Sequence, residues 1–273
     1  MEFEQELDEI FAALKENPFL DSQVEVLSDD ELDALPRPTY AEFIQALRRI
    51  PPNHAALGLD EQGYPVLIPF QGNDIGSTLV IGDANSQKER LLCLLLQSAS
   101  QTNPYNAFQA AVLTADPATW LNLVQTRPTC QHVLEMRAGY DTLSGRMILR
   151  IAASARRRAL ALEHRRPLLF LVDDLKIIEG LDFDARVNFE WLLRTGNSLG
   201  IHIFCAATPE TVYELGQYAD LCRTWVMGSI NNSIIRTQMA SIAGLDPEWN
   251  IPQGMFTVCD SRSGLNFWLP EYE

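Results

Sequence analysis

Cysteine, long apolar runs and positive charge are all scarce in this 273-residue chain. The five cysteines are odd in number and widely spaced, and they form neither a C-x-x-C pair nor a Cys/His cluster. This spacing excludes a disulfide framework and argues against a zinc site. We therefore expect reduced thiols, mostly buried in apolar segments, at Cys93, Cys130, Cys205, Cys222 and Cys259.

No apolar run approaches the roughly 18 to 20 residues that a membrane-spanning helix requires. The first residues, MEFEQELDE, are acidic, whereas a signal peptide begins with positive charge. These absences predict a cytoplasmic protein. Lys and Arg number 21 against 36 Asp and Glu, which gives a net charge of −15. That balance disfavours nucleic acid or an anionic membrane as the main partner, although a local basic groove remains compatible with it.

Much of the negative charge is concentrated at the start of the chain. Up to Leu35 there are twelve acidic residues and one basic residue, Lys15. Helical spacing of apolar residues predicts an amphipathic helix over residues 2–15, and Ser28–Glu31 resembles the capping box of a second short helix. We interpret residues 1–38 as an acidic helical arm and residues 39–273 as the main domain. The arm either packs on its own domain or docks on a partner protein, and mimicry of DNA is a third alternative.

The main domain has the pattern of an α/β fold. Apolar strand-like segments, among them FQAAVLT (108–114), LLFLV (168–172) and GIHIFCAA (200–207), alternate with helical segments from about residue 75 onward. Hairpins are predicted within residues 57–70 and 255–269, and an amphipathic helix over residues 40–50. The alternation predicts a largely parallel sheet with helices on both faces.

The segment from Ser77 to Leu96 carries the most informative motif. An apolar strand, Leu79–Ile81, enters a loop that opens at Gly82 and leads into a helix. This is the setting of the phosphate-binding pattern G-x-x-x-x-G-K-[ST], in which backbone N–H groups and a helix N-terminus bind the anion. The first glycine and the lysine have the right spacing. The candidate nucleotide-binding residues are therefore Gly82, Asn85, Ser86, Gln87, Lys88 and Glu89.

Two positions of this motif carry unsuitable chemistry. Gln87 replaces the second glycine, whose missing side chain lets the loop curl around the β-phosphate. Glu89 replaces the hydroxyl that ligates Mg²⁺ and puts a carboxylate beside the phosphates, where like charges repel. The motif thus predicts a degenerate nucleotide site. Lys88 remains, and its alternative interpretation is a surface lysine in the first turn of a helix.

A second half of such a site follows roughly 85 residues later, where LLFLV ends in Asp173 and Asp174. In a working P-loop enzyme the first acid would hold Mg²⁺ and the second would activate the attacking water. Asp173 is accordingly a candidate metal ligand and Asp174 a candidate catalytic base. The alternative is that two acids cap a strand end at a solvent-exposed loop.

Two further features have structural interpretations. Positive charge gathers on one predicted helix, residues 144–164, and just after it, at Arg146, Arg150, Arg156, Arg157, Arg158, Arg165 and Arg166. In an acidic protein this favours a solvated face paired with acids, or an interface to an acidic partner, over contact with nucleic acid, because no aromatic residues are interleaved to stack bases. His202 lies within a predicted buried strand and is expected to be a core residue.

Taken in order, these motifs resemble the FtsK/SpoIIIE-type motor domain of the FtsK–HerA class, including the degenerate ATPase domains of type VII secretion. The family's Asp-Pro-Lys strand end is similar to Asp116–Ala118, its Gly-Ile-His segment to residues 200–209, and its closing Gly-x-Gly-Asp-Met to Pro252–Phe256. Thr208 stands where the family's glutamine would sense the γ-phosphate. The resemblance covers about residues 57–270.

The resemblance implies a P-loop NTPase fold with a RecA-like core, ATP and Mg²⁺ as cofactors, and frequently a hexameric ring. Because the departures fall on the phosphate chemistry, our first hypothesis is a pseudo-ATPase that binds a protein partner or further copies of itself in a translocation, secretion or DNA-handling system. The alternative is a divergent active translocase that uses Lys88, Asp173 and Asp174. A third hypothesis is a chain that binds nucleotide as a structural ligand without hydrolysing it.

Overall fold

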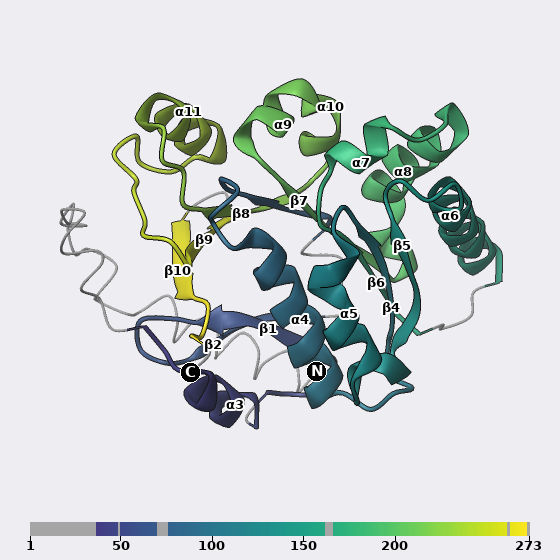
Figure 1. Ribbon diagram of the computed structural model, residues 1–273, viewed down its shortest axis with the longest axis horizontal. Coiled ribbons are helices and arrows are strands. Elements are labelled where there is room, and N and C mark those ends of the chain that lie inside the picture. Colours follow the sequence, from purple (N-terminus) through teal and green to yellow (C-terminus); the bar gives the residue numbers. More distant parts are fainter. Residues whose placement is uncertain (1–36, 49, 70–75, 162–165, 261–262, 272–273) are drawn as a thin grey trace, which may run out of the picture.

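The computed structural model describes residues 37–48, 50–69, 76–161, 166–260 and 263–271. The two helices predicted within residues 1–36 lie outside the described residues. A ten-stranded sheet forms the centre of the molecule, in the order β2-β1-β10-β9-β8-β3-β7-β6-β4-β5 (Figure 1). Its strands are β1 (His54–Leu59), β2 (Pro65–Pro69), β3 (Thr78–Ile81), β4 (Gln109–Thr114), β5 (Val133–Ala138), β6 (Leu168–Val172), β7 (Ile201–Ala207), β8 (Thr224–Gly228), β9 (Met255–Asp260) and β10 (Ser263–Trp268).

The sheet has a parallel and an antiparallel part. Strands β8, β3, β7, β6, β4 and β5 pair in parallel. The β1–β2 and β9–β10 hairpins, both predicted from sequence, continue the sheet beyond β8 with antiparallel pairing. The predicted largely parallel α/β sheet is therefore confirmed. The edge strand β5 was not predicted, because its sequence VLEMRA is only partly buried and lacks the apolar run of the central strands.

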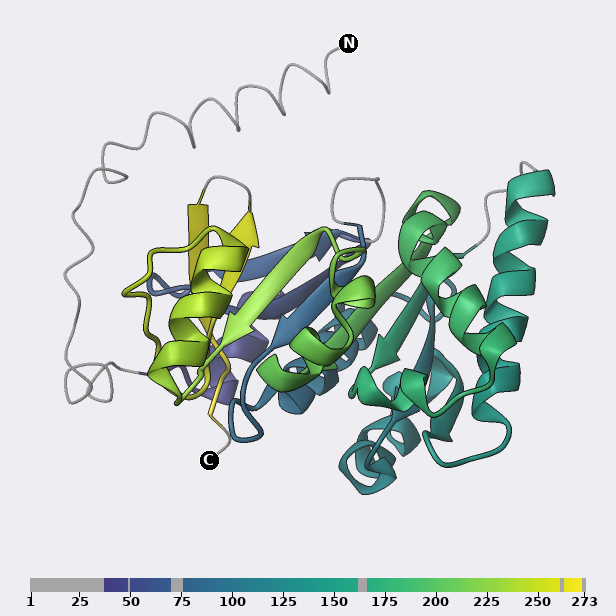
Figure 2. The same cartoon turned by 90° about the horizontal axis from the view of Figure 1, so that it is seen from above.

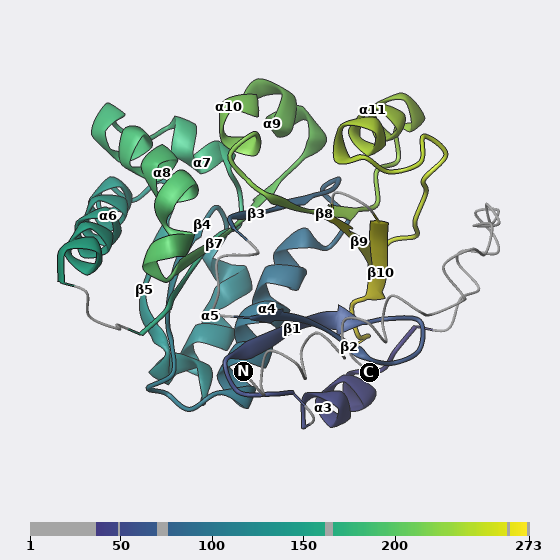
Figure 3. The same ribbon diagram turned by 180° about the vertical axis from the view of Figure 1, so that it is seen from behind.

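Helices cover both faces of the sheet, as predicted (Figures 1 and 3). Alternate residues of a strand point to opposite faces, so Leu79 and Ile81 of β3 join one core while Val80 joins the other. One face carries α3 (Tyr40–Leu47), α4 (Lys88–Thr102) and α5 (Pro117–Gln125). The other carries α6 (Ser144–Ala161), α7 (Lys176–Glu179), α8 (Phe183–Thr195), α9 (Pro209–Glu214), α10 (Gly216–Ala219) and α11 (Ser233–Ala243), seen from above in Figure 2.

Several local expectations are met. His202 is buried inside β7, and the cysteines are free thiols, with Cys205, Cys222 and Cys259 buried and the other two partly exposed. Among the described residues, none of the helices is both long and apolar enough to cross a membrane. A Thr39–Glu42 capping box begins α3, where a helix was predicted from Tyr40.

The two hairpins approach each other closely at Gly58 of β1. A Cβ atom at this position would lie 2.3 Å from the Trp268 carbonyl oxygen of β10. Gly58→Ala should therefore push β1 away from β10 and lower the free energy of unfolding by about 1–3 kcal/mol. Gly216→Ala is the matched control, because nothing lies within 4 Å of its added Cβ. Chemical denaturation of both variants measures the difference, and equal stability would contradict the assigned packing.

Candidate functional site

The segment after β3 has the strand–loop–helix path of a P-loop. β3 lies between β7 and β8, and its loop crosses the carboxyl ends of these strands before α4 begins at Lys88. Gly82 is required because a Cβ there would lie 2.4 Å from the Ser86 Oγ. Gln87, at the position of the missing second glycine, has φ of 69° and ψ of 25°. The backbone thus keeps a left-handed turn that glycine adopts at lower cost.

The loop is held by contacts with segments far away in the sequence. The Asp83 carboxylate accepts a hydrogen bond from the Asn231 backbone N–H at 2.7 Å, and the Gln253 side chain donates to the Asn85 carbonyl at 2.6 Å. The Gln87 side-chain oxygen accepts from the Arg90 guanidinium at 2.6 Å. The Asp83 and Gln87 side chains and the Asn85 carbonyl are therefore engaged within the protein itself.

Lys88 is buried, with 4% of its surface exposed, so the interpretation as a surface lysine is wrong. Its ammonium donates to the Asp83 carbonyl at 3.1 Å and lies 3.0 Å from a Glu89 carboxylate oxygen. The Glu89 side chain is more exposed, at 37%. In a P-loop the ammonium at this position binds phosphate, whereas here the Lys88 ammonium is paired with the carboxylate of the next residue, Glu89.

Asp173, at the end of β6, is almost completely buried. One carboxylate oxygen accepts a hydrogen bond from the Ala115 N–H at 2.7 Å. The other accepts from the Trp120 indole N–H at 2.7 Å and from the Thr114 hydroxyl. These donors come from the end of β4 and from α5. Asp116 is the N-cap residue of α5. A buried carboxylate surrounded by three donors is a structural anchor that joins β6, β4 and α5.

Burial raises the pKa of the Asp173 carboxyl, and the three hydrogen bonds act in the opposite direction without cancelling that effect. The negative charge of nearby Glu89 adds to the increase. The Glu89 carboxylate is therefore close enough to disfavour the ionisation of Asp173. This electrostatic environment is unlike a site prepared for an anionic phosphate.

A cavity of about 600 Å³ brings together four of the predicted site residues: Gln87, Glu89, Asp173 and Asp174. Asp116, Thr119 and Arg90 also line it. Asp174 is only partly exposed, and its carboxylate accepts the Lys176 backbone N–H at 2.9 Å. Thr208 is not part of this lining; its hydroxyl caps the N-terminus of α9 by accepting the Thr211 N–H at 3.3 Å, and Pro209 follows as the first helical residue.

The residues present do not fit a Mg²⁺–nucleotide. The position of the metal-binding hydroxyl holds Glu89, which pairs with Lys88, while both oxygens of Asp173 are used by protein donors. Within the described part of the chain, no group of three or more His, Cys, Asp or Glu residues is placed to hold a metal ion. Sequence reasoning missed Trp120 and Thr114, because nothing in their spacing shows that they bond to Asp173.

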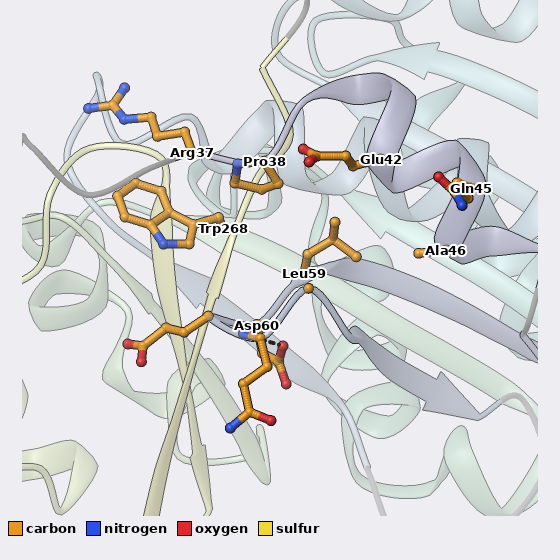
Figure 4. Close-up of a pocket in the computed structure, with 11 residues that line it drawn as sticks. Arg37, Pro38, Glu42, Gln45, Ala46, Leu59, Asp60 and Trp268 are labelled. Carbon is orange, nitrogen blue, oxygen red and sulfur yellow. Dashed lines mark hydrogen bonds between the residues drawn. The ribbon is translucent and has the colours of Figure 1, made fainter.

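A second hollow, of about 420 Å³, lies between α3, the β1–β2 turn and β10 (Figure 4). The Arg37 guanidinium lies 5.5 Å from the centre of the Trp268 ring and contacts the Glu271 carboxylate at 3.2 Å. Asp60, which also lines the hollow, uses one carboxylate oxygen to accept the Gln62 and Tyr64 N–H groups of the turn. These contacts explain how the first described residues attach to the sheet; none of the predicted site residues lies here.

The sequence matches no family model and no curated protein. Solved structures are similar in fold. One is the structure of EccC ATPases 2 and 3 from Thermomonospora curvata in complex with a signal sequence peptide. It matches 88% of this chain at 18% sequence identity, with a TM-score of 0.67. Another is the structure of EssC ATPases 2 and 3 from Geobacillus thermodenitrificans. It matches 87% of this chain at 15% sequence identity, with a TM-score of 0.64.

A third similar structure is the conjugation coupling protein TcpA of pCW3 with ATPγS, with 86% of this chain covered, 14% identity and a TM-score of 0.62. The chain spans 44% of the EccC structure, 45% of the EssC structure and 69% of TcpA. These likenesses confirm the FtsK-like P-loop ATPase fold predicted from the motifs. At such identities they show the fold alone.

Trp120→Phe tests the anchor at Asp173. The variant keeps an aromatic ring but removes the indole donor, so the free energy of unfolding should fall by about 1.5–3 kcal/mol, the range for a hydrogen bond to a charged group. Trp249→Phe is the matched control, because its indole donates at 3.0 Å to a neutral hydroxyl, that of Thr257. Its loss should be smaller, about 0.5–1.5 kcal/mol. A larger loss for Trp249→Phe, measured by chemical denaturation, would contradict this ranking.

The raised pKa of Asp173 makes a separate prediction about pH. A carboxyl that holds its proton more tightly when folded contributes stability below its ordinary pKa of 3.8 and loses it as pH rises through the raised value. Asp173→Asn cannot titrate. The difference in unfolding free energy, wild type minus variant, should therefore fall as pH is raised from about 4 toward neutrality. A difference that is constant or grows with pH would show that the folded-state pKa is not raised.

Proposed function

We propose that this chain is a pseudo-ATPase domain: a P-loop fold that serves as a partner-binding or assembly module of a translocation system and does not turn over ATP. One observation carries the proposal. The carboxylate expected to hold Mg²⁺, Asp173, is buried with the Thr114, Ala115 and Trp120 donors on its two oxygens. The three protein donors leave about one of the four acceptor positions of this carboxylate for a metal ion, on a side chain that is almost completely buried.

The lysine supports the same conclusion. In an active P-loop the lysine must be available to the phosphates, but here the Lys88 ammonium lies 3.0 Å from the Glu89 carboxylate. An incoming triphosphate would compete with Glu89 for Lys88, and it would meet the like charges of Glu89, Asp116 and Asp174 along the same cavity. The lysine of the motif is therefore already paired with a carboxylate, and Arg90 is the remaining cation among the residues that line this cavity.

The structural neighbours support the setting of the proposal. EccC is described as a type VII secretion ATPase and TcpA as a conjugation coupling protein. We infer that this chain acts beside a translocating ATPase, on the cytoplasmic side, through contacts with a protein partner or with further copies in a ring. A signal sequence peptide is bound by EccC, which makes a protein substrate a reasonable partner class to test first.

A second candidate is a chain that still binds nucleotide. The left-handed turn at Gln87 and the buried Lys88 preserve the shape of the loop, and the adjoining cavity is about 600 Å³. If the Lys88–Glu89 pair opens, the chain could hold a nucleotide as a structural ligand, or act as the divergent translocase that uses Lys88, Asp173 and Asp174. This candidate requires binding that depends on Lys88.

Thermal unfolding with and without Mg²⁺–ATP separates these candidates. Wild type should show no shift, whereas a chain that binds ATP at one hundred times its Kd would gain about 2.7 kcal/mol. The variant Gln87→Gly/Glu89→Thr restores the loop pattern and should gain stability from ATP, unlike the same variant carrying Lys88→Ala. A shift in wild type that is abolished by Lys88→Ala would overturn the proposal in favour of the nucleotide-binding candidate.

A further inference from the structure

The charge of this protein is strongly polarised along the chain. Residues 1–35, here called the acidic segment, account for −11 of the net charge of −15, which leaves −4 for residues 36–273. Positive charge is concentrated on α6, which carries five arginines and no acidic residue: Arg146, Arg150, Arg156, Arg157 and Arg158. The most acidic and the most basic parts of the chain are thus two separate segments.

The arginines of α6 differ in how they are used. Arg156 lies 4.7 Å from the centre of the Trp191 ring and donates to the Asn188 side chain at 2.7 Å. Arg158 donates to the carbonyls of Leu199 and Gly200 on the domain itself. Arg150 pairs with Glu135 of β5 but remains exposed. Arg146 and Arg157 are exposed, and within the described residues neither has an acidic partner.

Arg146, Arg150 and Arg157 form one stripe along α6, here called the α6 stripe. Positions 146, 150 and 157 lie close to one face, because residues four and seven apart stack along an α-helix. Leu160, 85% exposed, lies three residues further on, and Tyr140, 81% exposed, precedes the helix. The opposite face, with Met147, Ile148 and Ile151, packs into the core. The outward surface of α6 is therefore cationic, with the exposed Leu160 near its C-terminal end and Tyr140 four residues before its first residue.

We propose that this α6 stripe is the docking site of the chain's own acidic segment. Charge complementarity supports this occupant: acids at positions 2, 4, 6, 8 and 9 accompany the apolar residues Phe3, Leu7, Ile10 and Phe11, so carboxylates can meet Arg146 and Arg157 while apolar side chains meet the exposed Leu160 or Tyr140. At 18 residues, α6 is about 27 Å long. That length accommodates residues 2–15.

The length of the tether permits the contact within one molecule. The first described residue, Arg37, lies beside Trp268 of β10, and α6 lies at the β5 end of the sheet (Figure 1). Seven inter-strand spacings separate β10 from β5, about 34 Å. Residues 17–36 can span at most about 70 Å. A tethered partner also has an effective concentration in the millimolar range, which favours the intramolecular contact over one between copies.

The test uses the full chain with the photoreactive amino acid benzoylphenylalanine in place of Leu7. After irradiation at low salt, the crosslinked product should have the mass of a monomer, and mass spectrometry should place the link within residues 140–161. The yield should fall steeply at about 0.5 M salt, because screening weakens exposed charge pairs. Links that map elsewhere, a product with the mass of a dimer, or no link at low salt would each overturn the proposal.

Charge reversal shows whether the stripe itself is responsible. Arg146→Glu/Arg157→Glu should lower the yield about tenfold, since two attractions become repulsions. The control Arg127→Glu/Arg223→Glu changes the net charge equally at exposed positions away from α6 and should leave the yield unchanged. Adding Glu4→Arg/Asp8→Arg to the α6 variant should restore the link. Equal yields in the α6 variant and the control would contradict the assignment even if a crosslink forms.

Discussion

The buried carboxylate of Asp173 holds together the part of the sheet that carries the candidate site. It directly follows β6, the third strand from the β5 edge of the sheet, and its donors come from the end of β4 and from α5. In a P-loop enzyme a carboxylate at this position supports a metal ion, whereas here it stabilises the junction of three elements. Removal of one donor leaves the buried carboxylate with fewer hydrogen bonds, which lowers the stability of the fold. In this chain the carboxylate at that position holds three elements together.

The second constraint is electrostatic. A P-loop binds phosphate because an unoccupied lysine and several backbone N–H groups face the same point. In this chain the Lys88 ammonium is already within 3.0 Å of Glu89, and the adjoining cavity is bordered by further carboxylates at Asp116 and Asp174. The backbone shape of a nucleotide site thus persists while the charge that would attract a nucleotide is neutralised locally. Under the function proposed above, this fold serves as a scaffold for other contacts.

Much of the fold could be predicted from sequence, because its central strands are long apolar runs bounded by turn residues, as in LLFLV and GIHIFCAA. The degenerate loop was predictable for a similar reason, since Gln87 and Glu89 contradict a motif with strict spacing. The roles of Trp120 and Thr114 were not, because a contact between residues more than fifty positions apart leaves no periodic pattern. The burial of Lys88 was equally inaccessible, since it depends on how α4 packs on the sheet. The edge strand β5 was not predicted, because in a half-buried strand the alternation of apolar and polar residues is too weak to recognise.

The central claim is that the site is closed to Mg²⁺–nucleotide by its own side chains. Calorimetric titration of ATP into the full chain, with and without Mg²⁺ and beside Lys88→Ala, measures this most directly. We expect no heat of specific binding in any of these titrations. Saturable binding that requires both Mg²⁺ and Lys88 would show that Asp173 and Glu89 exchange their protein partners for the ligand, and would contradict the account.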